Sequence, residues 1–311
     1  MVSPRKPTSV EIWVVQGIGH TILHFLDLAS FDTVLTVLQA KPEFHDYLQD
    51  TVLWSELTQV HFGGKREAEV TATARSQARN RVWANRDRTC WELHQFLRSM
   101  DELKRFEESV TIVEGDIQGI DSIEGRPLDG IAFPTSSSLA NPHMGAAGAV
   151  FCRAGRGLEE YVNGESFRSS LSNELRWLPA GTVVVTPSFQ AGVSKLIHCV
   201  GPSVGMTDCY ELLSQTYERV MACAVSENLQ CIAMASVSTG NLGIPCEKGA
   251  QVALRSIQKF IGRNTWHGKV ALVCYDKRAL RAFMDEKASV VKNFNVIPPL
   301  PDNDYAPTYY F

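Results

Sequence analysis

The spacing of hydrophobic and polar residues changes near residue 110. From about residue 12 to residue 106, apolar side chains recur at three- and four-residue steps, and no segment shows convincing strand alternation. This spacing predicts helices. From Val110 onward, short runs rich in β-branched residues alternate with segments of helical spacing. Such alternation is typical of an α/β domain in which helices cover a central sheet.

The same pattern locates the elements of the α/β part. Strands are expected at 110–113, 131–133, 182–185, 195–200, 231–235 and 270–275. Helices are expected at 145–154, 210–225, 246–260 and 278–283. The end of the chain, which reads Ile-Pro-Pro-Leu-Pro from Ile297, is rich in proline and has no period, so a flexible tail is expected at 291–311.

Composition limits the class of protein. The chain has 311 residues, of which 44% are hydrophobic and 21% charged, as in a soluble globular protein. No apolar run is long enough to span a membrane, and the N-terminus lacks the apolar segment of a signal peptide. A formal charge of −4 argues against general nucleic-acid binding. None of the eight cysteines forms a Cys-x-x-Cys pair, which indicates reduced thiols, no metal site and a cytoplasmic or nuclear protein.

Polar and small residues follow three of the expected strands. Asp116 comes just after the first strand, where side chains reach the crevice at the carboxyl edge of a sheet. Small residues at 145–149 open a helix after the next strand, and the loop 238–243 precedes another helix that starts after Pro245. Unpaired N–H groups and the positive end of a helix dipole suit a phosphate. Two such loops beside one crevice predict a site for a diphosphate.

Several motifs in this region point to one family. They are GDI at 115–117, GAAGAVFCRAG at 145–155, LIHCVGP at 196–202, VSTGNLGIP at 237–245 and VALVCYD at 270–276. With these motifs in this order and spacing, residues 110–285 resemble a macrodomain, the ADP-ribose-binding module. The resemblance implies an α/β/α sandwich over 108–290 that takes ADP-ribose as its ligand, with no cofactor and no metal.

The resemblance also implies roles for individual residues. Asp116 would accept the exocyclic amine of adenine, the Ile117 amide would contact the ring, and Tyr275 would lie against its face. The first diphosphate loop would consist of Gly145, Ala146, Gly148, Ala149 and Val150, and the second of Ser238, Thr239, Gly240, Asn241 and Leu242. A helix cap is the alternative for Asp116, and a core aromatic is the alternative for Tyr275. His198, which lies between apolar residues of a strand, is assigned a structural role.

Two departures from the family bear on catalysis. Hydrolytic members carry an Asn-Ala-Ala-Asn strand end and an aspartate in the first loop, which position and activate a water. Here the strand end reads FPTS, with Ser136 last, and the loop position holds Ala147, which cannot accept a proton. We therefore expect a protein that reads ADP-ribose and does not remove it. The alternatives are an ADP-ribosyl hydrolase with a non-standard catalytic set and a scaffold with a degenerate macrodomain.

The helical part resembles an F-box over 21–63. The resemblance rests on the segment HFLDLASF at 24–31 and on the ending DTVLWSEL at 50–57, although the usual Leu-Pro at the start is absent. It implies an all-helical domain at 10–63 that docks a Skp-type adaptor of a cullin ubiquitin ligase, followed by a helical connector at 64–107. Phe25, Leu28 and Phe31, spaced three apart, are expected to form the adaptor-binding face. The alternative is a helical cap on the macrodomain. Together the two halves would make a substrate receptor that converts an ADP-ribose mark into ubiquitination.

Overall fold

The structure, a computed structural model, describes residues 18–65, 89–171 and 177–304. The chain forms two compact units, Met1–Lys104 with Val291–Ile297 and Arg105–Val290 with Pro298–Phe311. The start of the expected F-box-like domain (10–17), most of the connector (66–88) and the end of the tail (305–311) lie outside the described residues. Within the described part, no helix is both long and apolar enough to cross a membrane.

The first unit is helical. Its elements are α2 (Ile18–Phe25), α3 (Leu28–Ala40), the 3₁₀ helix η1 (Pro42–Phe44), α4 (His45–Gln49), α5 (Thr51–Phe62) and the larger part of α7 (Trp91–Ser109). The Asp27 carboxylate accepts from the Ser30 N–H at 2.8 Å, and Asp50 accepts from the Leu53 N–H at 2.9 Å, so each caps the start of a helix. Gly63 ends α5 in the left-handed region. Helices are therefore present where the spacing predicts them, whereas the F-box family itself stays a prediction.

Aromatic side chains form the core of the helical unit. The ring centroids of Phe31 and Phe96 are 4.8 Å apart, and those of Trp54 and Phe96 are 5.2 Å apart. Phe31 is fully buried, Leu28 is half-buried and Phe25 is 85% exposed. The expectation that Phe25, Leu28 and Phe31 form one exposed face is therefore wrong. Their even spacing is interrupted because α2 ends at Phe25 and α3 begins at Leu28.

The expected flexible tail is fixed over part of the length that the structure describes. Asn295 is buried, and its side chain accepts from the Ser99 hydroxyl at 2.9 Å and donates to the Gly64 carbonyl at 3.0 Å. Its backbone N–H donates to the Phe62 carbonyl at 3.0 Å. These bonds return residues 291–297 to the helical unit. They join residues far apart in the sequence, so no local pattern could predict them.

The second unit is built on a mixed sheet with the strand order β1-β8-β7-β4-β6-β5. The strands are β1 (Val110–Glu114), β4 (Gly130–Thr135), β5 (Val183–Pro187), β6 (Lys195–Val200), β7 (Cys231–Ala235) and β8 (Lys269–Cys274). Neighbouring strands are parallel except β5, which is antiparallel to β6. Each overlaps a strand expected from the sequence. A short hairpin of β2 (Ser122–Ile123) and β3 (Arg126–Pro127), which the pattern did not predict, lies between β1 and β4 in the chain.

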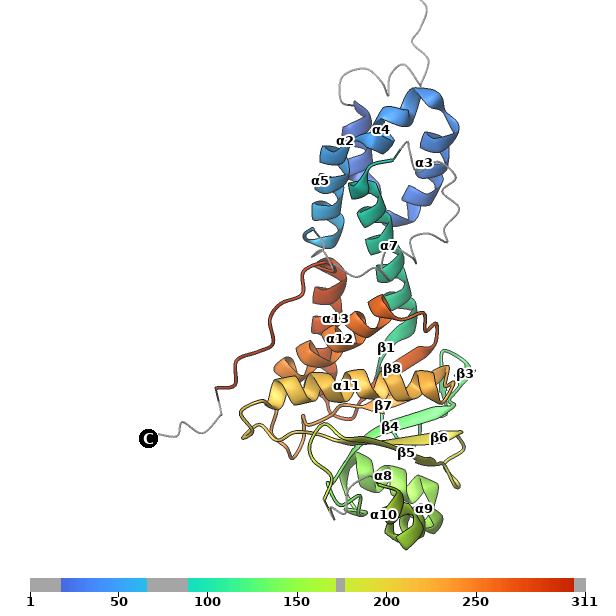
Figure 1. Cartoon of the computed structure of the whole chain (residues 1–311), viewed down its shortest axis with the longest axis vertical. Helices are drawn as coiled ribbons and strands as arrows, with labels where there is room; N and C mark the ends of the chain where they lie inside the picture. The colour runs from blue at the N-terminus through green and yellow to red at the C-terminus, as the bar shows by residue number, and fades with distance from the viewer. Residues whose placement is uncertain (1–17, 66–88, 172–176, 305–311) are drawn as a thin grey trace, which may run out of the picture. The chain divides into compact units, whose positions relative to one another are not determined.

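Helices cover both faces of the sheet, as Figure 1 shows. On one side lie α8 (Gly145–Ala154), α9 (Arg156–Asn163) and α10 (Glu165–Ser170), and on the other lie α11 (Cys209–Ser226), α12 (Cys246–Arg263) and α13 (Lys277–Lys292). This arrangement confirms the expected α/β/α sandwich. The sequence pattern did not predict α9 and α10, and it ended the last helix at residue 283, well before Lys292.

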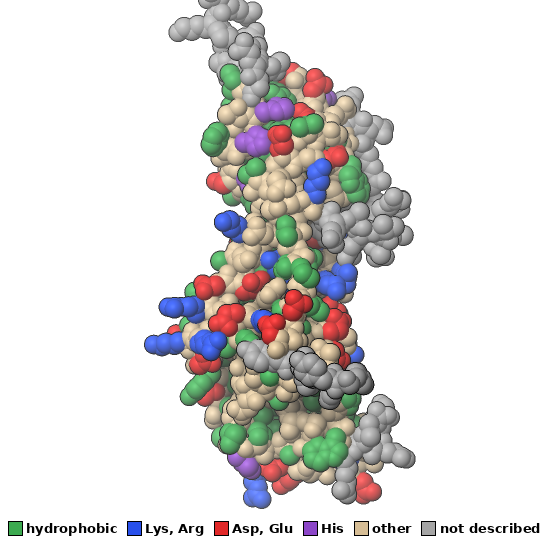
Figure 2. Space-filling view, turned by 90° about the vertical axis from the view of Figure 1, so that its left-hand side faces the viewer, with side chains coloured by type: hydrophobic (Ala, Val, Ile, Leu, Met, Phe, Trp, Pro, Cys, Tyr) green, Lys and Arg blue, Asp and Glu red, His purple; other side chains and the backbone are tan. Residues whose placement is uncertain are grey.

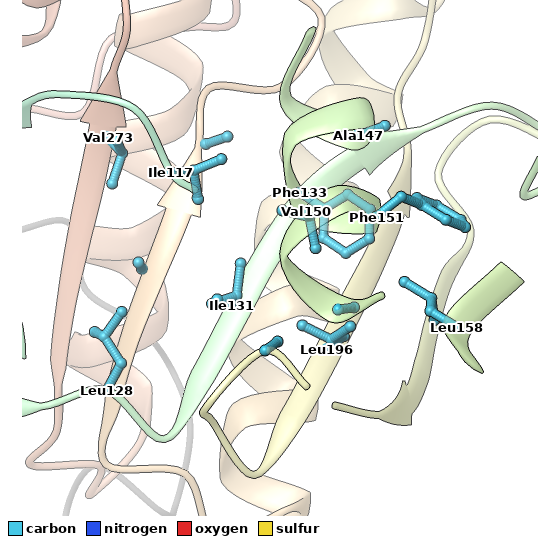
Figure 3. Packing of buried hydrophobic residues seen from close by; sticks show 14 of the residues in the cluster. Ile117, Leu128, Ile131, Phe133, Ala147, Val150, Phe151, Leu158, Leu196 and Val273 are labelled. Carbon is cyan, nitrogen blue, oxygen red and sulfur yellow. The ribbon is translucent and has the colours of Figure 1, made fainter. Parts of the chain in front are cut away.

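The core between the sheet and α8 follows from alternation along β4. Ile131 and Phe133 point to the same side of the strand, because side chains two residues apart share a face. Both are fully buried in one cluster with Val150 and Phe151 of α8 (Figure 3). This packing fixes α8 against the sheet and so positions the start of that helix.

His198 of β6 has a structural role, as its apolar neighbours predict. It is fully buried, and its ring centroid lies 4.6 Å from that of Phe133. Its Nε2 forms a hydrogen bond with the Thr186 hydroxyl at 3.0 Å. Burial lowers the pKa of His198 to about 3, so the ring is neutral at physiological pH.

Candidate functional site

The loops after the parallel strands meet at one edge of the sheet. Because β1, β8, β7, β4 and β6 all run in the same direction, their carboxyl ends lie together. The site residues predicted from the sequence follow β1, β4, β7 and β8. The two predicted phosphate loops follow β4 and β7, which are neighbours in the sheet. The fold thus brings residues from four distant segments to one edge.

One end of this edge combines a carboxylate with an exposed aromatic ring. The Gly115 N–H donates to the Cys274 carbonyl at 3.1 Å, which places Asp116 and Tyr275 at the ends of paired strands. Tyr275 is 81% exposed, so it is not a core aromatic. Asp116 Oδ1 accepts from the Gln118 N–H at 2.9 Å and closes a turn, so Asp116 does not cap a helix. Within the described part of the chain, Asp116 Oδ2 has no hydrogen bond and can accept one from a ligand.

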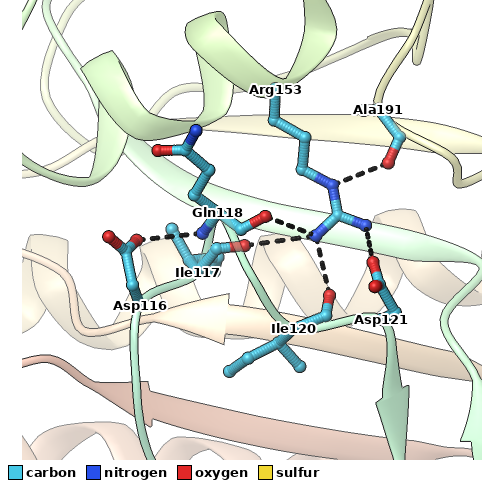
Figure 4. Close-up of polar contacts among 7 residues, drawn as sticks. All are labelled: Asp116, Ile117, Gln118, Ile120, Asp121, Arg153 and Ala191. Atoms are coloured by element: carbon cyan, nitrogen blue, oxygen red, sulfur yellow. Dashed lines mark hydrogen bonds and ion pairs between the residues drawn. The ribbon is translucent and has the colours of Figure 1, made fainter.

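The loop after β1 is held by Arg153 of α8, a residue that sequence reasoning missed. As Figure 4 shows, the Arg153 guanidinium donates to the Ile120 carbonyl at 2.7 Å, to the Gln118 carbonyl at 3.1 Å and to the Asp121 carboxylate at 2.7 Å. It also donates to the Ala191 carbonyl at 2.7 Å. The loop is thereby fixed against α8. The signal in the sequence is a basic residue inside an apolar helix, which indicates a buried partner without identifying it.

The start of α8 presents open backbone N–H groups. Met144 precedes the helix and provides no side-chain cap, so Gly145, Ala146 and Ala147 have N–H groups without a partner inside the helix. Gly145 has a φ of +61°, and a side chain there would meet nothing within 4 Å. This helix end is therefore accessible to a ligand, and its dipole favours a negative charge.

Only the first part of the predicted first phosphate loop has open N–H groups. The Gly148 N–H donates to the Met144 carbonyl at 3.0 Å, and Ala149 and Val150 lie in the next turn, where N–H groups bond to carbonyls one turn back. Val150 is fully buried in the core. Gly148, Ala149 and Val150 therefore have no free N–H for a phosphate. Gly148 has a packing role instead, because a Cβ there would lie 2.7 Å from the His143 backbone.

The loop after β7 supplies the larger set of free donors. The Ile244 N–H donates to the Ser238 carbonyl at 3.0 Å, and the Gly243 N–H donates to the Gly240 carbonyl at 2.9 Å. These two bonds curl the loop back on itself. Among the residues that the structure describes, the N–H groups of 238–242 have no acceptor. The predicted second loop is thus arranged to receive an anion.

Buried groups hold this second loop in place. The phenol oxygen of Tyr217, on α11, accepts from the Val237 N–H at 3.0 Å, and burial raises the pKa of Tyr217, so the phenol stays protonated. Ser238 is buried with a φ of +65°, and its Oγ has no hydrogen-bond partner among the described residues. A Cβ at Gly201 would come within 2.3 Å of that oxygen, so glycine is needed there. The Ser238 hydroxyl is a buried polar group that a ligand oxygen can satisfy.

Groups suited to acid–base chemistry are few beside these loops. Ala147 is buried where hydrolytic relatives were expected to carry an aspartate, and Ser136 Oγ lies 3.1 Å from Ser138 Oγ, with which it shares a hydrogen bond. His143, which precedes α8, is exposed. Within the described ranges, no three His, Cys, Asp or Glu residues are grouped as metal ligands. The arrangement is suited to an anion and an aromatic base, and His143 is a candidate proton acceptor just before the start of α8.

Charges of both signs are intermixed on the surface. On the face that Figure 2 shows, Lys and Arg side chains lie among Asp and Glu side chains. Oppositely charged side chains also pair, as Lys195 does with Glu227 at 2.8 Å and Arg278 with Glu247 at 3.4 Å. The candidate anion site described above is built from backbone N–H groups and the start of a helix.

Known proteins match this part of the chain. The family model described as Macro domain matches residues 134–253. An O-acetyl-ADP-ribose deacetylase of Salmonella typhimurium is 33% identical over 105 residues, which are 33% of this chain and 59% of that protein, so the chain spans little more than half of the deacetylase. A macro domain-containing protein of Methanosarcina mazei is 28% identical over 177 residues, covering 56% of this chain and 86% of that protein.

Solved structures show the same fold. The Oceanobacillus iheyensis macrodomain with ADP superimposes with a TM-score of 0.54 and 27% identity, over 60% of this chain and 94% of that one. A variant of the same macrodomain with ADPR gives a TM-score of 0.54 and 27% identity, over 60% of this chain and 96% of that one. Within its second unit, this chain therefore contains a macro domain, which the family model places at residues 134–253.

Proposed function

We propose that the macro domain binds ADP-ribose and recognises it as a mark without removing it. The observation that carries this proposal is the pair of open loops on neighbouring strands, whose N–H groups at 145–147 and 238–242 have no acceptor in the described part of the chain. The solved Oceanobacillus iheyensis macrodomain with ADP supports the choice of a nucleoside diphosphate.

Each part of the ligand has a counterpart at the edge of the sheet. Adenine would place its exocyclic amine on Asp116 Oδ2 and its face against Tyr275, which are neighbours through the β1–β8 pairing. The diphosphate would lie between the start of α8 and the loop 238–242. Each charge-assisted hydrogen bond to a phosphate oxygen contributes about 1.5–3 kcal/mol, so several of them account for micromolar affinity without a basic side chain.

A second candidate function is hydrolysis of an ester of ADP-ribose. The names of relatives such as the Salmonella typhimurium deacetylase favour it, and so does the exposed His143 just before α8. Buried Ala147 and the hydrogen-bonded Ser136 oppose it, because neither can activate a water. A positioned general base is worth about 10²–10⁴-fold in rate, which sets the size of the expected difference.

The turnover of O-acetyl-ADP-ribose separates the two functions. We expect this chain to release acetate at least about a hundredfold more slowly than the Salmonella typhimurium deacetylase assayed beside it, because it lacks the positioned base. Product release is measured by chromatography for the wild type and for His143→Ala. A wild-type rate similar to that of the deacetylase would contradict recognition without removal, and its loss in His143→Ala would make His143 the base.

The helical unit is proposed to dock a Skp-type adaptor and so to couple ADP-ribose recognition to a cullin ubiquitin ligase. Support comes from apolar side chains that the unit leaves exposed on α2 and α5. Phe25 is 85% exposed, Val52 is 62% exposed and Ile18 is 40% exposed. The two helices lie together, since His24 Nε2 is 3.3 Å from Glu56 Oε2. Apolar surface that a small helical unit does not bury is a common mark of a partner site.

Co-purification of the adaptor tests this part of the proposal. Phe25→Asp is expected to abolish co-purification, because truncating an aromatic anchor costs about 2 kcal/mol or more of binding and a charge adds to that. Val37→Asp, at a position on α3 that is 48% exposed, is the matched control and should retain the adaptor. If the wild type brings down no adaptor, or Phe25→Asp retains it fully, the ligase assignment fails and the helices have another role.

A further inference from the structure

The last residues that the structure describes, 302–304, contact the macro domain beside its second loop. Asn303 Nδ2 donates to the Val204 carbonyl at 3.0 Å and to the Met206 carbonyl at 2.7 Å, both in the loop after β6. Lys248 Nζ, on α12, donates to the Asp302 carbonyl at 2.7 Å and lies 2.7 Å from Asp304 Oδ2. The segment therefore joins two elements that lie far from it in the sequence.

The loop after β6 is itself bonded to the second phosphate loop. The Val204 N–H donates to the Leu242 carbonyl at 2.9 Å. Val204 also packs closely on the neighbouring Gly243, because a Cβ built at that glycine would lie 3.1 Å from Val204 Cγ1. Asn303 and Leu242 thus contact the same residue, one at its carbonyl oxygen and the other at its N–H.

We propose that residues 302–304 act as a strap that holds the loop 238–242 in its anion-binding conformation, with Asn303 as the positioning residue. This inference rests on the proposed binding of ADP-ribose by the same loop. Asn303 touches no ligand atom in the proposal; it acts through Val204 on Leu242. The strap therefore raises the affinity for ligands that contact the loop 238–242. It does not change the proposed contacts of adenine with Asp116 and Tyr275.

Within the strap, Asn303 makes a stronger attachment to the macro domain than its charged neighbours do. An amide NH₂ group has two protons, and the two carbonyls of the β6 loop use both of them. The Lys248–Asp304 pair has an acid that is 71% exposed, and exposed ion pairs contribute little. Aspartate at position 303 would have nearly the same shape as asparagine. Its carboxylate oxygen, which can only accept, would then face the Val204 and Met206 carbonyl oxygens, which also only accept.

The test is Asn303→Asp in the full chain, with ADP-ribose and AMP as probes. Calorimetry is expected to show roughly a tenfold loss of affinity for ADP-ribose, within the usual range of coupling between sites. The affinity for AMP is expected to stay unchanged, because AMP lacks the second phosphate and the distal ribose. Asn163→Asp, at the exposed end of α9, is the matched control and should bind both ligands as the wild type does.

Hydrogen exchange without ligand gives a second, independent readout. The strap predicts faster exchange of the 238–242 amides in Asn303→Asp and unchanged exchange at 145–147. Unaltered affinity together with unaltered exchange would overturn the strap, and so would an equal loss of ADP-ribose and AMP binding. If the wild type gives no heat with ADP-ribose, the proposed function fails, while faster exchange in the variant would still support the strap.

Discussion

Replacing Gly145 with valine is expected to weaken ADP-ribose binding by about 3 kcal/mol, roughly a hundredfold, because it removes one or two charge-assisted hydrogen bonds. The new side chain would stand in open space at the start of α8, beside the free N–H groups of Ala146 and Ala147. A phosphate could then no longer approach these donors. Calorimetry with the full chain measures the loss.

Gly125→Val is the matched control for this change. Gly125 lies in the β2–β3 turn with a φ of +79°, and a side chain there would also meet nothing within 4 Å. Both variants force a branched residue into the left-handed region, which costs about 1–3 kcal/mol of stability, so their melting temperatures should fall alike. Only Gly145→Val should lose binding. Full retention of affinity by Gly145→Val would show that no phosphate sits at the start of α8.

Asp116→Asn is expected to weaken ADP-ribose binding by about 1.5–3 kcal/mol, or tenfold to somewhat more than a hundredfold. The asparagine oxygen can still accept from the Gln118 N–H, so the turn that Asp116 closes is kept. Its NH₂ group would face the adenine amine, and two donors cannot bond to each other. The comparison of wild type and variant by calorimetry therefore isolates the contact with the base.

The control for Asp116→Asn is Asp285→Asn. Asp285 is an exposed aspartate on α13, outside the edge where the ligand is expected. The Asp285→Asn substitution removes the same charge from the protein as Asp116→Asn does, so any general electrostatic effect on a negative ligand appears in both variants. Equal affinities in the two variants would mean that Asp116 makes no contact with adenine, and the proposed placement of the base would be wrong.

The strands and the two loops could be predicted because their signals are local. Runs such as 195–200 and 231–235 are apolar and β-rich, and the small residues of 145–147 and 238–242 stand where a strand gives way to a helix. Parallel strands then place the loops at one edge without further information. Resemblance supplied the expected role of Asp116, and the structure added that Tyr275, which follows the neighbouring strand β8, is exposed.

The residues that support the site could not be predicted, because each acts across a long stretch of sequence. Arg153 holds the loop after β1, Tyr217 holds Val237, and Asn303 holds the loop after β6. A motif also does not show where the first helical turn ends, so the sequence did not separate Gly148, Ala149 and Val150, whose N–H groups lie within α8, from the open N–H groups before them.

Phe31 shows a further limit of pattern reasoning. Phe25 and Phe31 are each three residues from Leu28, which is the spacing of neighbours on one helix face, but the chain breaks between α2 and α3. Phe31 then packs against Phe96 of α7, and Phe25 stays in solvent. Spacing alone identifies an apolar residue without showing whether it belongs to the core or to a partner surface.

The central claim, that the macro domain of this chain binds ADP-ribose, is tested most directly by calorimetric titration of the full chain with ADP-ribose and, in parallel, with AMP. We predict saturable heat with ADP-ribose at a micromolar Kd, and weaker binding of AMP, which lacks the second phosphate and the distal ribose and so does not reach the free N–H groups at 238–242. The absence of heat from folded protein at near-millimolar ADP-ribose would contradict the account and leave a macro domain without this ligand.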